Sequence, residues 1–80
     1  MPELIRFEGI TIDIYYDEHL PPHFHATYGE RVELIVIRTL GTYRGSIPPQ
    51  QRKKVIKWAK QEGIQTMLEE IFFEFNPELK

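Results

Sequence analysis

The hydrophobic pattern of this chain changes its period once, close to Ser46, and that change restricts the fold more than any other feature. Between residues 10 and 16, isoleucines alternate with polar residues, which is the two-residue period of a half-buried strand. Between residues 55 and 59, apolar side chains gather on one side at helical spacing. The order therefore favours strands followed by helices.

Turn and cap residues divide this pattern into short elements. We expect strands at residues 4–7, 10–16, 23–28 and 31–40, to which residues 42–44 could add a short edge strand, and helices at about 47–62 and 64–75. With 80 residues the chain forms one domain with a thin core. The prediction is a single α+β domain: an antiparallel sheet of three or four strands in residues 1–45, followed by two helices in residues 46–76 that pack on one face.

The same spacing predicts which side chains share a face. In the strand at residues 23–28, one face carries His23, His25 and Thr27, and the other carries Phe24, Ala26 and Tyr28. The buried stripe of the second helix is expected to consist of Ile64, Met67, Leu68, Ile71 and Phe75.

Composition removes several classes of protein. The chain has no cysteine, which excludes disulfides and thiolate metal sites. Residues 1–6 lack the basic and apolar pattern of a signal peptide, and no apolar stretch is long enough to cross a bilayer. We therefore expect a cytoplasmic protein that does not contact membranes.

All three histidines, at positions 19, 23 and 25, lie on either side of the turn at Pro21-Pro22. One interpretation is acid–base chemistry on RNA, with His19, His23, His25 and Tyr28 as the catalytic residues. Arg31 or Arg44 would supply the cation that binds the phosphate.

Two other interpretations of the histidines stay open. His23 and His25 could hold a metal ion if a third ligand came from His19, Asp17 or Glu33. Alternatively, the histidines support the turn through hydrogen bonds and carry no chemistry. The sequence does not decide whether a metal binds, and it gives no sign of an organic cofactor.

A run of bases without any acid lies in the first predicted helix. Arg52, Lys53, Lys57 and Lys60 are the candidate nucleic-acid-binding residues, because lysine and arginine contact phosphates. The alternative is an ordinary solvated helix face.

The end of the second helix carries three aromatic residues, Phe72, Phe73 and Phe75, and Phe73 is expected on the face opposite the core. An exposed aromatic residue of this kind indicates a subunit or partner surface. The alternative is that Phe73 folds under the C-terminal tail.

The segment Tyr15–Gly29 resembles the signature YYxDHxPPHFHAxYG of a family of small bacterial proteins described as a domain of unknown function, DUF4160. The likeness extends over roughly residues 4 to 72. This chain has one more residue than usual between Asp17 and His19, and Glu70-Ile71 replaces the usual Asn-Trp. The resemblance implies a neighbouring gene for a second small protein, in the manner of a toxin–antitoxin pair.

Three functions follow as expectations. The first is a toxin-like effector that acts on or binds RNA, with the neighbouring gene's product as its partner. The second is a non-catalytic protein-interaction module, which could form a homodimer, and the third is a histidine-based metal-binding domain. Whether the protein is an enzyme stays open.

Overall fold

The computed structural model of the chain describes residues 3–16 and 18–80. The strands are β1 (Glu3–Phe7), β2 (Ile10–Asp13), β3 (His23–Tyr28), β4 (Arg31–Val36) and β5 (Thr42–Gly45). The helices are α1 (Pro49–Ala59), α2 (Ile64–Phe75) and a short 3-10 helix, Pro77–Leu79. The predicted α+β class, with the sheet first and two helices after it, is confirmed.

The prediction of three or four strands was wrong, because the sheet has five, in the order β1-β2-β3-β4-β5 with every neighbouring pair antiparallel. The strand that sequence reasoning supported least is β5, in which all four residues are exposed. A strand without a buried face shows no alternating apolar signal, although its backbone pairs with β4.

Tight turns join the first strands of this meander. Glu8 and Gly9, with φ of 50° and 79°, connect β1 to β2, and Gly29, with φ of 63°, begins the turn from β3 to β4. Positive φ in the turn matches the right-handed twist of the paired strands. Both turns lie in the gaps between the strand ranges expected from the sequence.

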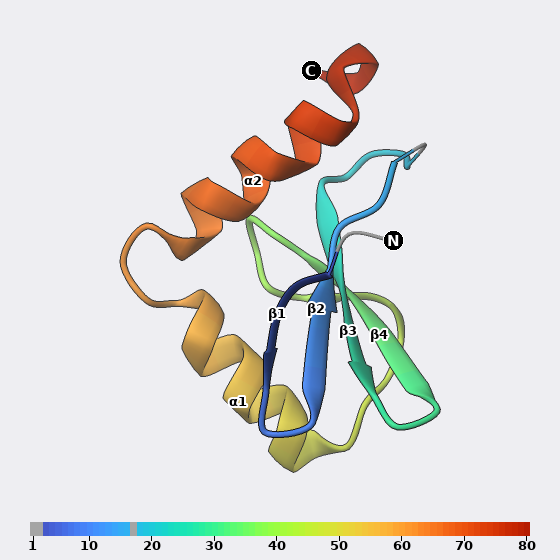
Figure 1. Ribbon diagram of the computed structural model, residues 1–80, viewed down its shortest axis with the longest axis vertical. Coiled ribbons are helices and arrows are strands. Elements are labelled where there is room, and N and C mark those ends of the chain that lie inside the picture. Colours follow the sequence, from blue (N-terminus) through green and yellow to red (C-terminus); the bar gives the residue numbers. More distant parts are fainter. Residues whose placement is uncertain (1–2, 17) are drawn as a thin grey trace.

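The two faces of the sheet differ in what covers them (Figure 1). On one face, the side chains of Ile12, Phe24 and Ile35 are fully buried and pack with Val55 of α1 and Leu68 of α2. The opposite face carries the alternate residues of β2, β3 and β4, among them Asp13, His23, His25 and Leu34. We call this second surface the open face.

The strand ends differ from those expected. β2 ends at Asp13, so Tyr16 does not continue the buried row of isoleucines. Tyr16 is exposed, and its ring stacks on that of Phe75 with the centroids 4.5 Å apart. The strand predicted at residues 31–40 ends at Val36.

The first helix packs as predicted, with Val55 and Ala59 buried and Lys53, Lys57 and Lys60 exposed. It begins at Pro49 and ends at Ala59, and is therefore shorter than expected at both ends.

The predicted bounds of α2 are correct, but its buried stripe is displaced. Leu68 and Phe72, one turn apart, are its buried residues, whereas Met67 is exposed. Phe73, expected on the outer face, is half-buried against the core cluster. Of the aromatic residues at the end of the helix, Phe72 is thus buried, and Phe73 and Phe75 are half-buried against the core.

A buried carboxylate connects β4 to β5 and α1. Glu33 lies on the core side of β4 and is almost completely buried. Its oxygens accept hydrogen bonds from the Thr42 hydroxyl, from Ile47 N–H (3.1 Å) and from Arg52 Nε (2.8 Å). Burial alone would raise the pKa of Glu33, but the hydrogen bonds from Thr42, Arg52 and Ile47 and the charge of Arg52 outweigh it and lower the pKa.

We predict that Glu33→Gln lowers the free energy of unfolding by about 2 kcal/mol, the usual worth of a buried hydrogen bond to a charged group. The pKa of the Glu33 carboxyl is lower in the folded than in the unfolded state, so the ionised group stabilises the fold. This stabilisation is fully present above the pKa of the unfolded state. The contribution is lost as the pH falls through the folded pKa, so the variant should lose stability less steeply in acid than the wild type.

Urea unfolding at several pH values measures both effects. Glu30→Gln, which changes an exposed glutamate in the turn before β4, is the matched control and should unfold like the wild type. Equal stability of the Glu33 and Glu30 variants would contradict this account.

Candidate functional site

His23 and His25 lie two residues apart on β3 and share the open face, as predicted. Their ring centroids are 5.5 Å apart. His23 is buried, whereas 18% of the His25 side chain is exposed. One ring is therefore sealed in the structure and the other is reached by solvent.

Glu18 joins the two rings. His23 Nε2 and His25 Nε2 each lie 2.8 Å from the same oxygen, Glu18 Oε2. We call Glu18, His23 and His25 the histidine–glutamate cluster. Burial alone would raise the pKa of Glu18, but the hydrogen bonds from the two imidazoles and their charge lower it below its ordinary value.

The diproline turn holds His23 from its other side. His23 Nδ1 lies 2.8 Å from the Pro21 carbonyl oxygen, and the Pro22 carbonyl accepts a hydrogen bond from Ile37 N–H on the neighbouring chain segment. The Leu20-Pro21 peptide bond is cis. The turn thus contributes a backbone acceptor that orients the buried imidazole.

Asn76, at the end of α2, holds the loop that carries Glu18. Its side chain is fully buried, its Oδ1 accepts from Glu18 N–H (2.8 Å), and its Nδ2 donates to the carbonyls of Tyr15 and Phe72 (3.0 Å each). The end of α2 and the loop between β2 and β3 accordingly meet at one end of the molecule (Figure 1). Asn76 is the positioning residue of the cluster.

Aromatic rings surround the cluster. The Tyr15 ring meets His25 edge-on with the centroids 4.4 Å apart, and Tyr43 of β5 stacks on His23 at 5.6 Å. Burial, the charge of Asp13 and a hydrogen bond to it, and the charge of Glu18 all raise the pKa of Tyr15.

Of the other residues predicted for catalysis, His19 lies beside this cluster without joining it, and Tyr28 lies apart from it. His19 is exposed, with its ring 5.5 Å from that of His23, and Nδ1 lies 3.3 Å from the Leu20 carbonyl oxygen. Tyr28 lies at the other end of β3 and on the core side. Of the third ligands considered for a metal, Asp17 falls outside the described residues and Glu33 lies on the opposite face.

The sequence reasoning missed Glu18 and Asn76. Glu18 precedes the two histidines by five and seven residues, and this spacing was the available signal. Asn76 had no local signal, because its hydrogen-bond partners Glu18 and Tyr15 are about sixty residues away along the chain.

The basic helix and the histidines lie on opposite sides of the sheet. Phe24 on the core side of β3 contacts Trp58 of α1, whereas His25, the next residue of β3, points to the open face. Arg52 already pairs with Glu33 and donates to the Leu40 carbonyl (2.9 Å). The exposed lysines of α1, Lys53, Lys57 and Lys60, therefore form a surface separate from the cluster.

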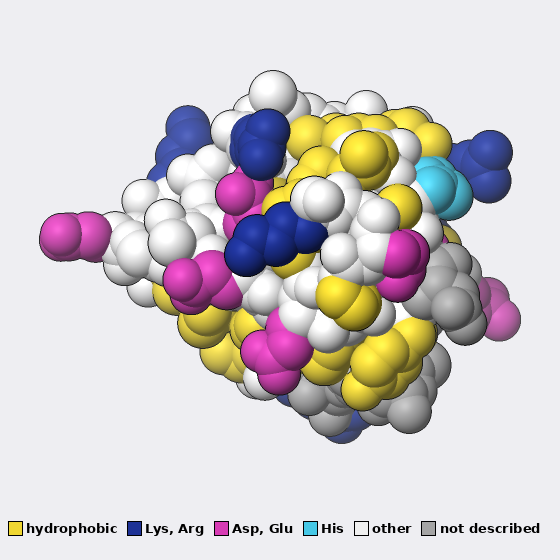
Figure 2. All heavy atoms as spheres, turned by 90° about the horizontal axis from the view of Figure 1, so that it is seen from above, with side chains coloured by type: hydrophobic (Ala, Val, Ile, Leu, Met, Phe, Trp, Pro, Cys, Tyr) yellow, Lys and Arg dark blue, Asp and Glu magenta, His cyan; other side chains and the backbone are white. Residues whose placement is uncertain are grey.

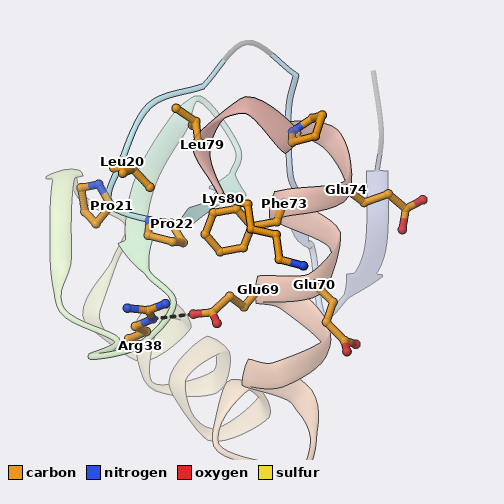
Figure 3. A pocket seen from close by; sticks show the side chains of 11 residues that line it. Leu20, Pro21, Pro22, Arg38, Glu69, Glu70, Phe73, Glu74, Leu79 and Lys80 are labelled. Atoms are coloured by element: carbon orange, nitrogen blue, oxygen red, sulfur yellow. Dashed lines mark hydrogen bonds and ion pairs between the residues drawn. The ribbon is translucent and has the colours of Figure 1, made fainter.

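An open groove of about 1240 Å³ lies between the diproline turn and the end of α2. In Figure 3, Phe73 points from α2 towards Pro22, and an ion pair joins Arg38 to Glu69. Seen from the end at which α2 finishes, hydrophobic side chains gather between charged ones (Figure 2). The groove lining includes Leu20, Pro21, Pro22, Phe73, Glu70 and Glu74.

Comparison with known proteins identifies the family. The family model described as a domain of unknown function, DUF4160, matches residues 9–69, and the chain belongs to that family. No curated protein and no solved structure matches the chain. The matched range contains the whole histidine–glutamate cluster but not Asn76.

Within the described residues, no helix is long and apolar enough to cross a membrane.

We predict that Asn76→Ala loosens the loop that carries Glu18 and lowers the free energy of unfolding by about 1–3 kcal/mol, because buried backbone groups lose their partners. Hydrogen exchange should show faster exchange of the Glu18 amide, with the amides of β4 still protected. Glu78→Ala, in the exposed part of the 3-10 helix, is the control. An unchanged Glu18 amide in the Asn76 variant would show that the contact does not hold the loop.

Proposed function

We propose that this domain is an RNA-binding effector that contacts single-stranded RNA through the open face of its sheet, beside the histidine–glutamate cluster. The observation that carries this proposal is the position of Tyr43 and Arg44 on the same face as His25. The toxin-like role in a two-gene system comes from the family resemblance, and the RNA-binding surface is argued from the side chains below.

Tyr43 offers a platform for stacking. The residue is 42% exposed, and its ring lies against that of His23, which is itself fixed by Glu18 and Pro21. A ring supported from behind loses little freedom when a base stacks on it. Single-stranded RNA is commonly bound by such aromatic side chains on a sheet surface.

Arg44 supplies charge beside that platform. Leu34 of β4 lies opposite both His25 of β3 and Arg44 of β5, so the three share the open face. Adjacent strands lie about 4.8 Å apart, which puts Arg44 about 10 Å from His25 across the sheet. An arginine at this distance can bind one phosphate with two parallel hydrogen bonds while the neighbouring base reaches Tyr43.

The lysines of α1 offer a second surface for RNA, and the two surfaces make different predictions. We expect Tyr43→Ala to weaken binding of a fluorescent single-stranded RNA by about 1–3 kcal/mol, the usual cost of losing one stacked base. Arg44→Ala should weaken binding and reduce its salt dependence by about one phosphate contact. Lys57→Ala, which removes a charge on the far side of the sheet, is the matched control and should bind like the wild type.

Fluorescence anisotropy at several salt concentrations measures these effects, and circular dichroism confirms that each variant is folded. If the Lys57 variant binds RNA weakly and the Tyr43 variant binds it normally, the RNA-binding surface lies on α1 instead. If the wild type does not bind the single-stranded RNA, the proposal is wrong.

The groove favours a second function, the protein-interaction module. Its apolar part, formed by Leu20, Pro22 and Phe73, can bury aliphatic or aromatic side chains, and Glu70 and Glu74 lie at its border. We propose that it binds a segment of the neighbouring gene's product that combines apolar and basic side chains.

Charge reversal tests this second function. We expect Glu74→Lys to reduce co-purification of the neighbouring gene's product at least tenfold, because it places a like charge against the basic residues of the bound segment. Glu62→Lys, an exposed change between the helices and outside the groove, should co-purify normally. Equal capture by both variants would contradict the proposal.

A further inference from the structure

The histidine–glutamate cluster brings three metal-ligand atoms to one point. Glu18 Oε2, His23 Nε2 and His25 Nε2 all lie within 4.8 Å of one another, and Glu18 Oε2 is 2.8 Å from each nitrogen. Among the residues that the structure describes, this is the one group of three such side chains close enough to share an ion.

The partners of His23 match those of a metal-bound histidine. Both of its ring nitrogens face oxygen acceptors, Nδ1 the Pro21 carbonyl and Nε2 the Glu18 carboxylate. A neutral imidazole has only one N–H, so the second nitrogen needs either an additional proton or a cation. A metal at Nε2 meets this need, because ligating histidines typically donate their other N–H to a backbone carbonyl.

We propose that Glu18, His23 and His25 bind a divalent transition-metal ion on the open face. Two imidazoles and one carboxylate suit borderline first-row ions such as Zn²⁺ and Fe²⁺, whereas Mg²⁺ prefers oxygen ligands only. With three protein ligands, the ion keeps at least one position for water or another small ligand.

The site needs only a small adjustment to take the ion. Tetrahedral zinc with ligand distances near 2.1 Å would separate its donor atoms by about 3.4 Å, so each nitrogen would have to move about 0.6 Å from Glu18 Oε2. His23 is held by Pro21 and the Glu18 backbone by Asn76, whereas the side chains of His25 and Glu18 are 18% and 17% exposed. These two partly exposed side chains are the ones that can move, so the adjustment would fall on them.

This inference does not rest on RNA binding. The RNA proposal depends on Tyr43 and Arg44, neither of which is a proposed ligand. If the chain binds zinc but not RNA, only the RNA proposal fails, and if it binds RNA but not zinc, only the metal proposal fails.

Isothermal titration of the full, tag-free chain with ZnCl₂ after chelation tests the metal site. We expect one Zn²⁺ per chain and a higher melting temperature; at a free zinc concentration one hundred times the dissociation constant, the ratio of folded to unfolded protein rises about a hundredfold. His25→Ala and Glu18→Gln should each weaken binding by more than about a hundredfold, the upper end of the effect of losing an outer-shell partner. MgCl₂ should leave the melting temperature unchanged.

His19→Ala is the matched control, because it removes a neighbouring imidazole that is not among the proposed ligands. Nitrogen-15 NMR of the wild type adds a readout that does not depend on folding of any variant: zinc should shift the Nε2 signals of His23 and His25 and leave Nδ1 of His23 protonated. Zinc binding that survives His25→Ala, or that His19→Ala abolishes, would overturn the proposal. If the wild type binds no zinc, the proposal is wrong, and hydrogen bonds alone hold the cluster together.

Discussion

The carboxylate of Glu18, shared by two imidazoles, is the interaction around which one end of this domain is organised. It satisfies Nε2 of the buried His23 and Nε2 of the partly exposed His25 through a single oxygen. That arrangement requires a fixed loop, and Asn76 fixes it by bonding to the backbone of Glu18 and Tyr15. The last turn of α2 therefore determines the geometry of side chains that lie about sixty residues earlier.

Buried polar groups organise the rest of the domain in the same manner. Glu33 on the core side of β4 connects the edge strand and α1, as Glu18 on the open face connects the loop and β3. A small domain has little apolar surface to bury, and each buried polar group must be paired. These few hydrogen-bonded groups accordingly determine how the edge strand, the loop and the helices are placed on the sheet.

The sheet also separates two surfaces that the sequence analysis assigned to the same RNA-directed function. The lysines of α1 lie on the helix side, whereas the histidines, Tyr43 and Arg44 lie on the other. An exposed platform and a cluster of ligand atoms therefore share one surface, and this is why RNA binding and metal binding are both proposed for the open face.

The sequence by itself determined the α+β order, the tight turns and the shared face of His23 and His25, because period and turn chemistry are local properties. It indicated β5 only as a short additional edge strand, because the residues of β5 are all exposed, and it misplaced the buried stripe of α2, which depends on how the helix rotates against the sheet. It also did not identify Glu18 and Asn76 as partners. Only the tertiary structure decided these features, because a hydrogen bond between residues distant in the chain leaves no periodic trace in the residues that form it.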